Sequence, residues 1–218
     1  KTAFPVVVTE VMFSLLASVT FAIYGILGAA ELAVVQVAEV VANMAQVIFF
    51  GLGNASAVSI GGALGQNDPD RANEYAKISF KLAILLCAIT CTVIFVIAKP
   101  ISGLYTDFEP STIDLLIKTL WVWGIITIPK MINYVNICGI LRAGGDTKFG
   151  LIMDVSTMWG FSILLGAVAA FILHARVPVV YVILMSDELI KVPITLKRYL
   201  TYKWLRDVTR EQKELEEM

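Results

Sequence analysis

Six long apolar stretches, separated by short charged or glycine-rich segments, divide this chain. An α-helix rises about 1.5 Å per residue, so about 20 apolar residues are enough to cross the hydrocarbon core of a bilayer. The predicted helices lie at about Ala3–Leu27, Leu32–Leu64, Arg71–Ala98, Ser111–Leu141, Asp146–Leu173 and Pro178–Tyr202. The sequence therefore predicts an all-α fold, a polytopic membrane protein built as a bundle of six transmembrane helices.

The composition agrees with that class. Of the 218 residues, 58% are hydrophobic and 16% are charged, whereas soluble domains carry about 25% charged residues. We predict that residues 1–205 form the transmembrane domain and that residues 206–218 form a charged cytoplasmic tail. Because the chain starts at Lys1 and no signal peptide precedes the first span, we expect it to begin inside a longer protein.

The basic residues predict the orientation in the membrane. Thirteen of the 17 fall on the side that holds both termini: Lys1, Arg71, Lys77, Lys81, Arg142, Lys148, Lys191, Lys197, Arg198, Lys203, Arg206, Arg210 and Lys213. Only Lys99, Lys118 and Arg176 fall on the other side, and Lys130 lies in mid-helix. By the positive-inside rule, both termini are predicted to be cytoplasmic.

Glu10 is the one charged residue in the first predicted helix. A carboxylate in the middle of a membrane costs roughly 2.5–3.5 kcal/mol, so it normally faces a bundle interior or a wet cavity. Reversible binding of a proton or a cation would account for it, and a permanently neutral or paired packing residue is the alternative. Asp154, two turns into the fifth helix, is the second candidate for ion coupling.

The second predicted helix carries a polar stripe on an otherwise apolar surface. Its members are spaced by 3, 4 and 3 residues, which places them within a sector of about 80°: Gln36, Glu39, Asn43 and Gln46. A helix that faced only lipid would not concentrate polar groups in this way. The stripe is predicted to line a substrate cavity or, alternatively, a hydrogen-bonded seam between helices.

The fourth predicted helix is interrupted by Pro129, which has no N–H and is expected to kink it beside Lys130. Thr127, Lys130 and Tyr134 share a face, with Asn133 next to it. These residues are candidates to line the same cavity. Two roles stay open for Lys130, a substrate contact or an ion pair with a carboxylate.

In the sixth predicted helix, Asp187 and Lys191 are four residues apart and can neutralise each other as a structural ion pair. Cys87, Cys91 and Cys138 lie in apolar helices and His174 in an external loop, so their spacing builds no metal site. The chain has neither the nucleophile and base of an enzyme nor a phosphate-binding loop for ATP. We expect no cofactor, no catalytic residues and no nucleic-acid partner, and an ion gradient is left as the energy source.

Five segments, taken in order, resemble the second six-helix half of a transporter of the multidrug and toxic compound extrusion (MATE) family. They are Pro5–Glu10, Ala33–Ala38, Phe50–Gly65, Gly139–Thr147 and Met185–Lys191. The resemblance implies a V-shaped transporter of two six-helix lobes in the cell membrane. Such a transporter exports cationic or amphipathic compounds in exchange for Na⁺ or H⁺.

The resemblance also implies roles and partners. Glu10 matches the family's acid on the first helix of the second lobe, which takes part in cation coupling. Some branches carry a further acid on the fourth helix, but Thr127–Tyr134 has none and has Lys130 instead. The expected partners are membrane lipid, a drug-like small molecule, and a preceding six-helix lobe or a second copy. The alternatives are a lipid-linked flippase of similar build and a membrane interaction module that transports nothing.

Overall fold

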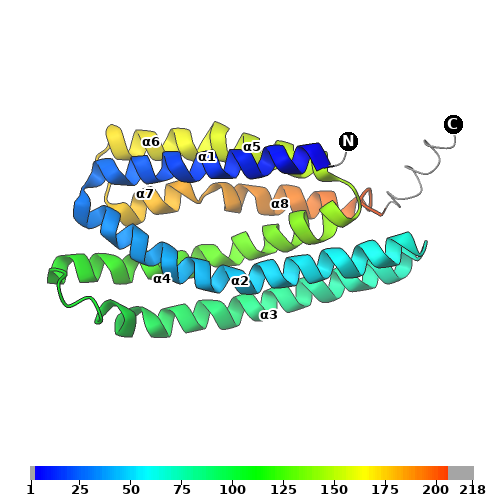
Figure 1. Cartoon of the computed structure of the whole chain (residues 1–218), viewed down its shortest axis with the longest axis horizontal. Helices are drawn as coiled ribbons and strands as arrows, with labels where there is room; N and C mark the ends of the chain where they lie inside the picture. The colour runs from blue at the N-terminus through cyan, green and yellow to red at the C-terminus, as the bar shows by residue number, and fades with distance from the viewer. Residues whose placement is uncertain (1–2, 206–218) are drawn as a thin grey trace.

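The computed structural model describes residues 3–205, and within that range the chain is almost entirely helical (Figure 1). The elements, in chain order, are α1 (Ala3–Leu27), α2 (Ala29–Gly65), α3 (Pro69–Ser102), α4 (Pro110–Tyr134), η1 (Val135–Leu141), α5 (Thr147–Thr157), η2 (Met158–Ile163), α6 (Leu164–Phe171), α7 (Val177–Leu184) and α8 (Asp187–Leu200). The two η segments are π-helices that continue their α-helices without a break. The predicted all-α class is confirmed.

The chain runs along the bundle six times. Five continuous helical segments are long and apolar enough to cross a membrane: Glu10–Leu27, Ala29–Gly65, Pro69–Ser102, Pro110–Leu141 and Thr147–Phe171. The range predicted as one sixth helix is divided at Met185 and Ser186 into α7 and α8. The start of α1 and the end of α8 lie at the same end of the bundle (Figure 1). The charged tail at residues 206–218 lies outside the described residues.

The helices form two groups. α2, α3 and α4 pack together, α1 packs with α5 and α6, and the broken pair α7 and α8 lies between the groups (Figure 1). The turn at Gly28 has a φ of 140°, a conformation that favours glycine. From this turn α1 and α2 diverge into different groups (Figure 1).

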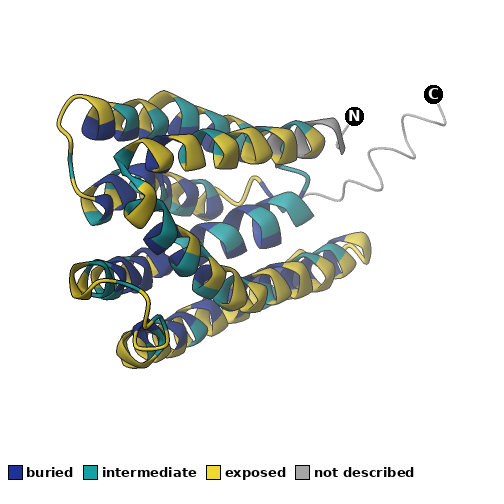
Figure 2. Ribbon diagram, turned by 60° about the vertical axis from the view of Figure 1, so that its left-hand side comes forward, coloured by how far each residue is buried: buried dark blue, intermediate teal, exposed yellow. Residues whose placement is uncertain are grey.

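Buried and exposed positions alternate around the helices (Figure 2). Many of the exposed side chains are large and hydrophobic. Met44, Val58 and Ile84 are among the large hydrophobic residues that are more than 60% exposed. Such a surface is unstable in water and suited to lipid. Inside the bundle, glycines allow close contact. A Cβ atom on Gly53 would lie 2.6 Å from the Tyr134 ring, so α2 and α4 can approach only because that side chain is absent.

Candidate functional site

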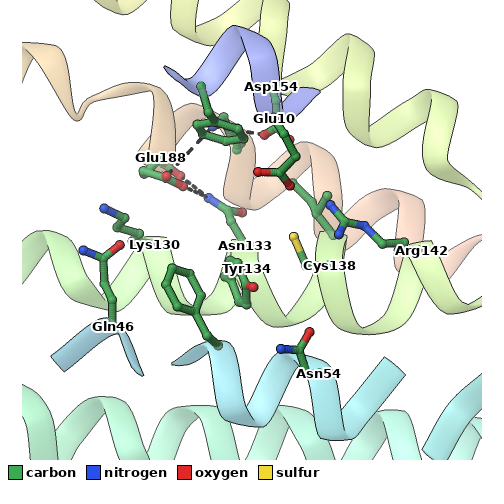
Figure 3. A pocket seen from close by; sticks show the side chains of 14 residues that line it. Glu10, Gln46, Asn54, Lys130, Asn133, Tyr134, Cys138, Arg142, Asp154 and Glu188 are labelled. Atoms are coloured by element: carbon green, nitrogen blue, oxygen red, sulfur yellow. Dashed lines mark hydrogen bonds and ion pairs between the residues drawn. The ribbon is translucent and has the colours of Figure 1, made fainter. Parts of the chain in front are cut away.

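A cavity of about 570 Å³ opens inside the bundle between α1 and α5 on one side and α2 and α4 on the other (Figure 3). Its volume lies in the range of pockets that hold drug-sized molecules. Its walls combine aromatic, amide and charged side chains: Glu10, Phe13, Gln46, Phe50, Asn54, Lys130, Asn133, Tyr134, Ile137, Cys138, Arg142, Asp154, Glu188 and Lys191. Five separate helices therefore contribute to one site.

Four of the lining residues follow one another at intervals of four: Lys130, Tyr134, Cys138 and Arg142. In a regular α-helix, with 100° per residue, each residue in such a series would point about 40° further around the helix axis than the one before it. The last of the four would then face away from the cavity. The π-helix η1 begins at Val135. A π-helix winds more slowly, with about 4.4 residues per turn. Within η1, each step of four residues therefore changes the direction of the side chain by roughly −33° instead of about +40°. The irregular segment thus keeps all four side chains on the cavity face.

A cluster of ionisable groups forms the inner wall of the cavity around the ammonium group of Lys191. Lys191 Nζ lies 2.7 Å from Asp187 Oδ2, 3.3 Å from Asp154 Oδ1 and 3.9 Å from Glu188 Oε1. The lysine side chain is only 2% exposed. Asp187 is the partner that the four-residue spacing predicts, whereas Asp154 belongs to α5 and ties that helix to α8. We refer to these four residues as the Lys191 cluster.

Asn133 connects the cluster to α4. Its amide nitrogen donates to the backbone carbonyl of Glu188 at 2.7 Å and to Glu188 Oε2 at 2.8 Å. Its amide oxygen accepts a hydrogen bond from the hydroxyl of Thr195 at 3.1 Å. On the other side, the backbone N–H of Asp187 donates to the hydroxyl of Ser162 in η2 at 3.2 Å. The start of α8 is therefore held by hydrogen bonds from two neighbouring segments.

Three charged groups that line the cavity make no ion pair within 4.0 Å in the described part of the chain: Glu10, Lys130 and Arg142. Glu10 is exposed and projects into the open space from α1, while Lys130 and Arg142 approach from the α4 side (Figure 3). The polar side chains of Gln46 and Asn54 face them from α2. These groups are free to meet a ligand or an ion.

Of the predicted polar stripe on α2, only Gln46 lines this cavity. Glu39 accepts a hydrogen bond from the hydroxyl of Tyr181 in α7 at 3.2 Å. Gln36 is exposed, and Asn43 is exposed and accepts a hydrogen bond from Gln46 at 3.3 Å. These three residues do not line this cavity, because α2 diverges from α1 and meets different neighbours along its length. The bond between Glu39 and Tyr181 is a contact between helices, the alternative that the polar stripe left open.

The structure moves two further residues from their predicted places. Thr127 is buried away from the cavity, and its hydroxyl donates to the backbone carbonyl of Trp123 at 3.0 Å. Lys191 was counted with the basic residues of the cytoplasmic side, but it lies inside the bundle. The remaining predicted residues, Lys130, Asn133 and Tyr134, do share the cavity with Glu10 and Asp154.

Two charged residues of the site were not predicted as such. Glu188 adjoins Asp187 and precedes Lys191 by three residues, a spacing that also brings side chains together on a helix. That signal was available in the sequence. Arg142 was assigned to the cytoplasmic surface because it follows the helix that η1 extends. A regular helical period gives no indication of η1 and therefore none of the direction of Arg142.

The fold and this cavity define a multi-pass α-helical membrane protein with a charged, drug-sized internal site. The family model MatE matches residues 5–168. The chain therefore belongs to the MATE family of membrane transporters. This membership bears out the resemblance that the sequence motifs indicate.

The curated relatives include a probable multidrug resistance protein NorM of Xanthomonas axonopodis pv. citri (strain 306). It is 27% identical over 167 residues, which cover 77% of this chain and 36% of the relative. An uncharacterized transporter, YisQ of Bacillus subtilis (strain 168), is 26% identical over 164 residues, which cover 73% of this chain and 35% of that protein. The chain thus spans little more than a third of the length of these relatives.

Two solved structures share the fold. An outward-facing multidrug resistance MATE family transporter of the MOP superfamily matches with a TM-score of 0.81 and 19% identity, over 94% of this chain and 45% of that one. A crystal structure of MATE in complex with MaL6 matches with a TM-score of 0.79 and 14% identity, over 93% of this chain and 46% of that one. Each match covers nearly all of the chain and less than half of the solved transporter.

Proposed function

We propose that this chain is the second six-helix lobe of a secondary-active antiporter that exports organic cationic or amphipathic compounds in exchange for H⁺ or Na⁺. The observation that carries the proposal is the exposed Glu10 carboxylate, which faces a drug-sized cavity inside a MATE-family lobe. The names of several relatives, multidrug resistance proteins, support the choice of cargo.

The cavity wall supports binding of amphipathic compounds. Phe13, Phe50 and Tyr134 offer apolar and aromatic surface, and the rings of Phe50 and Tyr134 pack at a centroid distance of 4.9 Å. Glu10 supplies one negative charge that is free of ion pairs within the described residues. A proton or a cation that binds Glu10 removes this charge, so drug and coupling ion compete for one group. Exchange requires that each binds the two conformations of the transporter with different affinity.

The proposal includes a partner lobe and a location. This chain matches slightly less than half of each solved transporter. The other half would be a preceding six-helix lobe, or a second copy of this chain. The exposed polar side chains of Gln36 and Asn43 need a protein or water partner if they lie within a membrane. We place the protein in the cell membrane with both termini cytoplasmic, because the basic residues remain asymmetric without Lys191.

The test is Glu10→Gln in the full-length transporter, with drug efflux measured under an imposed H⁺ or Na⁺ gradient. Glutamine fills the same space but cannot release a proton, so we expect gradient-driven efflux to be lost. The free energy of unfolding should stay within about 1 kcal/mol of the parent, because no buried charge is left unpaired.

The matched control is Glu39→Gln, which neutralises an acid of α2 that contacts Tyr181 and does not line the cavity. We expect this variant to retain gradient-driven efflux. Normal efflux by Glu10→Gln would refute the coupling role of Glu10. Equal loss of efflux in both variants would indicate that neutralising any acid within the membrane impairs transport. It would refute the assignment of the coupling role to this cavity.

Lys130 and Arg142 favour a second candidate function, a flippase for a lipid with an anionic headgroup. Both cations line the cavity without an ion pair in the described range, and together they could bind a phosphate group. Transfer of a fluorescent anionic lipid across vesicles that contain the transporter would distinguish this function. Lipid transfer that is lost in Lys130→Ala, with no gradient-driven drug efflux by the parent, favours the flippase, and drug efflux without lipid transfer favours the antiporter.

A further inference from the structure

The Lys191 cluster brings three carboxyl groups within 4 Å of one point inside the bundle. Hard cations are bound by several oxygen ligands at once, and carboxylates are the strongest of these ligands in proteins. Without its lysine, this arrangement would be the most anionic part of the described chain inside the bundle. It would be the natural place for an alkali cation to bind.

The ammonium group of Lys191 already occupies that point. It carries the same single charge as Na⁺, and its side chain is almost fully buried. Asp187 and Glu188 precede it by four and three residues on the same helix, so helix geometry alone keeps these partners beside it. Removing a buried charge from its partners is strongly unfavourable. Lys191 therefore stays in place while α8 is intact.

The other intramembrane acid of the cavity has a different environment. The titratable groups that line the cavity with Glu10 are Lys130, Tyr134, Cys138 and Arg142 from the α4 side, Asp154 from α5, and Glu188 and Lys191 from α8. Asp154 and Glu188 are engaged by Lys191. Glu10 is left as a single carboxylate, which offers fewer oxygen ligands than a hard cation such as Na⁺ binds. A single carboxylate is sufficient to take up a proton.

We propose that Lys191 is a built-in counter-cation that closes the carboxylate cluster to Na⁺, so that Glu10 is the exchangeable acid and H⁺ is the coupling ion. The inference rests on the proposed antiport function. In each cycle the Glu10 carboxylate accepts a proton from outside, releases the drug, and returns the proton to the cytoplasm. Lys191 is then a specificity-determining residue that takes no part in the proton transfer itself.

The first experiment measures Na⁺ binding without transport. Thermal unfolding of the purified full-length transporter is followed in NaCl and in choline chloride at equal ionic strength. We expect no difference for the parent. In Lys191→Ala, Na⁺ should replace the missing charge and raise the unfolding midpoint by about 1–3 °C. This is the shift for a protein about twice the length of this chain when the Na⁺ concentration is about ten times the dissociation constant. The matched control, Lys130→Ala, removes a cavity lysine that holds no carboxylate and should not respond to Na⁺.

A second variant covers the case in which Lys191→Ala does not fold. Lys191→Ala combined with Asp187→Asn removes one positive and one negative charge, so the formal charge of the cluster stays that of the parent. Na⁺ should stabilise this variant also, through Asp154 and Glu188. Absence of a Na⁺ effect in the folded lysine variants, or an equal effect in the parent, would overturn the proposal.

The second experiment places the parent in vesicles and drives efflux with either a pH gradient or a Na⁺ gradient. We expect efflux with the pH gradient alone. Efflux driven by the Na⁺ gradient would overturn the proposal while the antiport function stands. If no drug is exported under either gradient, the antiport function fails, and the Na⁺ response of the Lys191 variants still decides whether the lysine closes the cluster.

Discussion

Replacing Asn133 by alanine should loosen the attachment of α8 to α4. The Asn133 side chain is 2% exposed and makes three hydrogen bonds to α8: two to Glu188 and one with Thr195. Hydrogen bonds between membrane helices contribute about 0.6 kcal/mol on average and about 1.7 kcal/mol at most. With the carboxylate bond at that maximum and the other two at the average, the loss is roughly 3 kcal/mol.

The assay is reversible unfolding of the purified protein in mixed micelles, from which the free energy of unfolding is obtained. Thr195→Val is the matched control, because it keeps the side-chain shape and removes one of the three bonds. We expect it to cost about 0.6–1 kcal/mol. The reasoning is refuted if Asn133→Ala is no more destabilising than Thr195→Val.

A double-mutant cycle separates the charge of Glu188 from its shape. Glu188→Gln keeps an oxygen that can accept the hydrogen bond of Asn133 but removes the negative charge. The effect of Asn133→Ala should therefore be about 1 kcal/mol smaller in the Glu188→Gln background. Equal effects in both backgrounds would mean that the carboxylate charge adds nothing to this bond.

Two further predictions concern packing and orientation. Gly53→Ala should destabilise the fold by about 1–3 kcal/mol, because its Cβ would meet the Tyr134 ring, whereas Gly61→Ala on the same helix meets no atom within 4 Å and should be neutral in the same unfolding assay. A cysteine in place of Asn67 should react with an impermeant reagent only from the cytoplasmic side, and one in place of Glu109 only from outside. Labelling of both from the same side would contradict the six-pass arrangement.

The sequence could predict two kinds of site residue: pairs that are neighbours on one helix, and charges that lie inside a long apolar run. Asp187 and Lys191 are neighbours on one helix, so their spacing predicts the contact wherever the helix lies. Glu10 and Lys130 are charges inside long apolar runs, and such charges must face protein or water. The pairing of Asp154 with Lys191 joins α5 to α8. Neither helix contains a signal for that contact, because the contact depends on how the two helices pack.

The polar stripe of α2 shows the limit of periodicity. The spacing of Glu39 and Gln46 correctly implies one side of the helix, but it does not identify what faces that side. α2 has 37 residues, which makes it longer than a bilayer requires. It therefore passes several neighbours, and Glu39 meets Tyr181 while Gln46, two turns later, meets the cavity.

Three helix irregularities meet at the Lys191 cluster. The π-helix η1 begins two residues after Asn133, the π-helix η2 begins four residues after Asp154, and the break between α7 and α8 directly precedes Asp187. Irregular backbone inside a membrane is tolerated where protein surrounds it, and most of η1 is buried. A regular helix orients its side chains at fixed angles only. In an ionised cluster inside a bilayer, every charged group must reach its partners at a short distance and a suitable angle. The irregular segments supply those angles, and the ion pairs and hydrogen bonds of the cluster in turn hold the irregular segments in place.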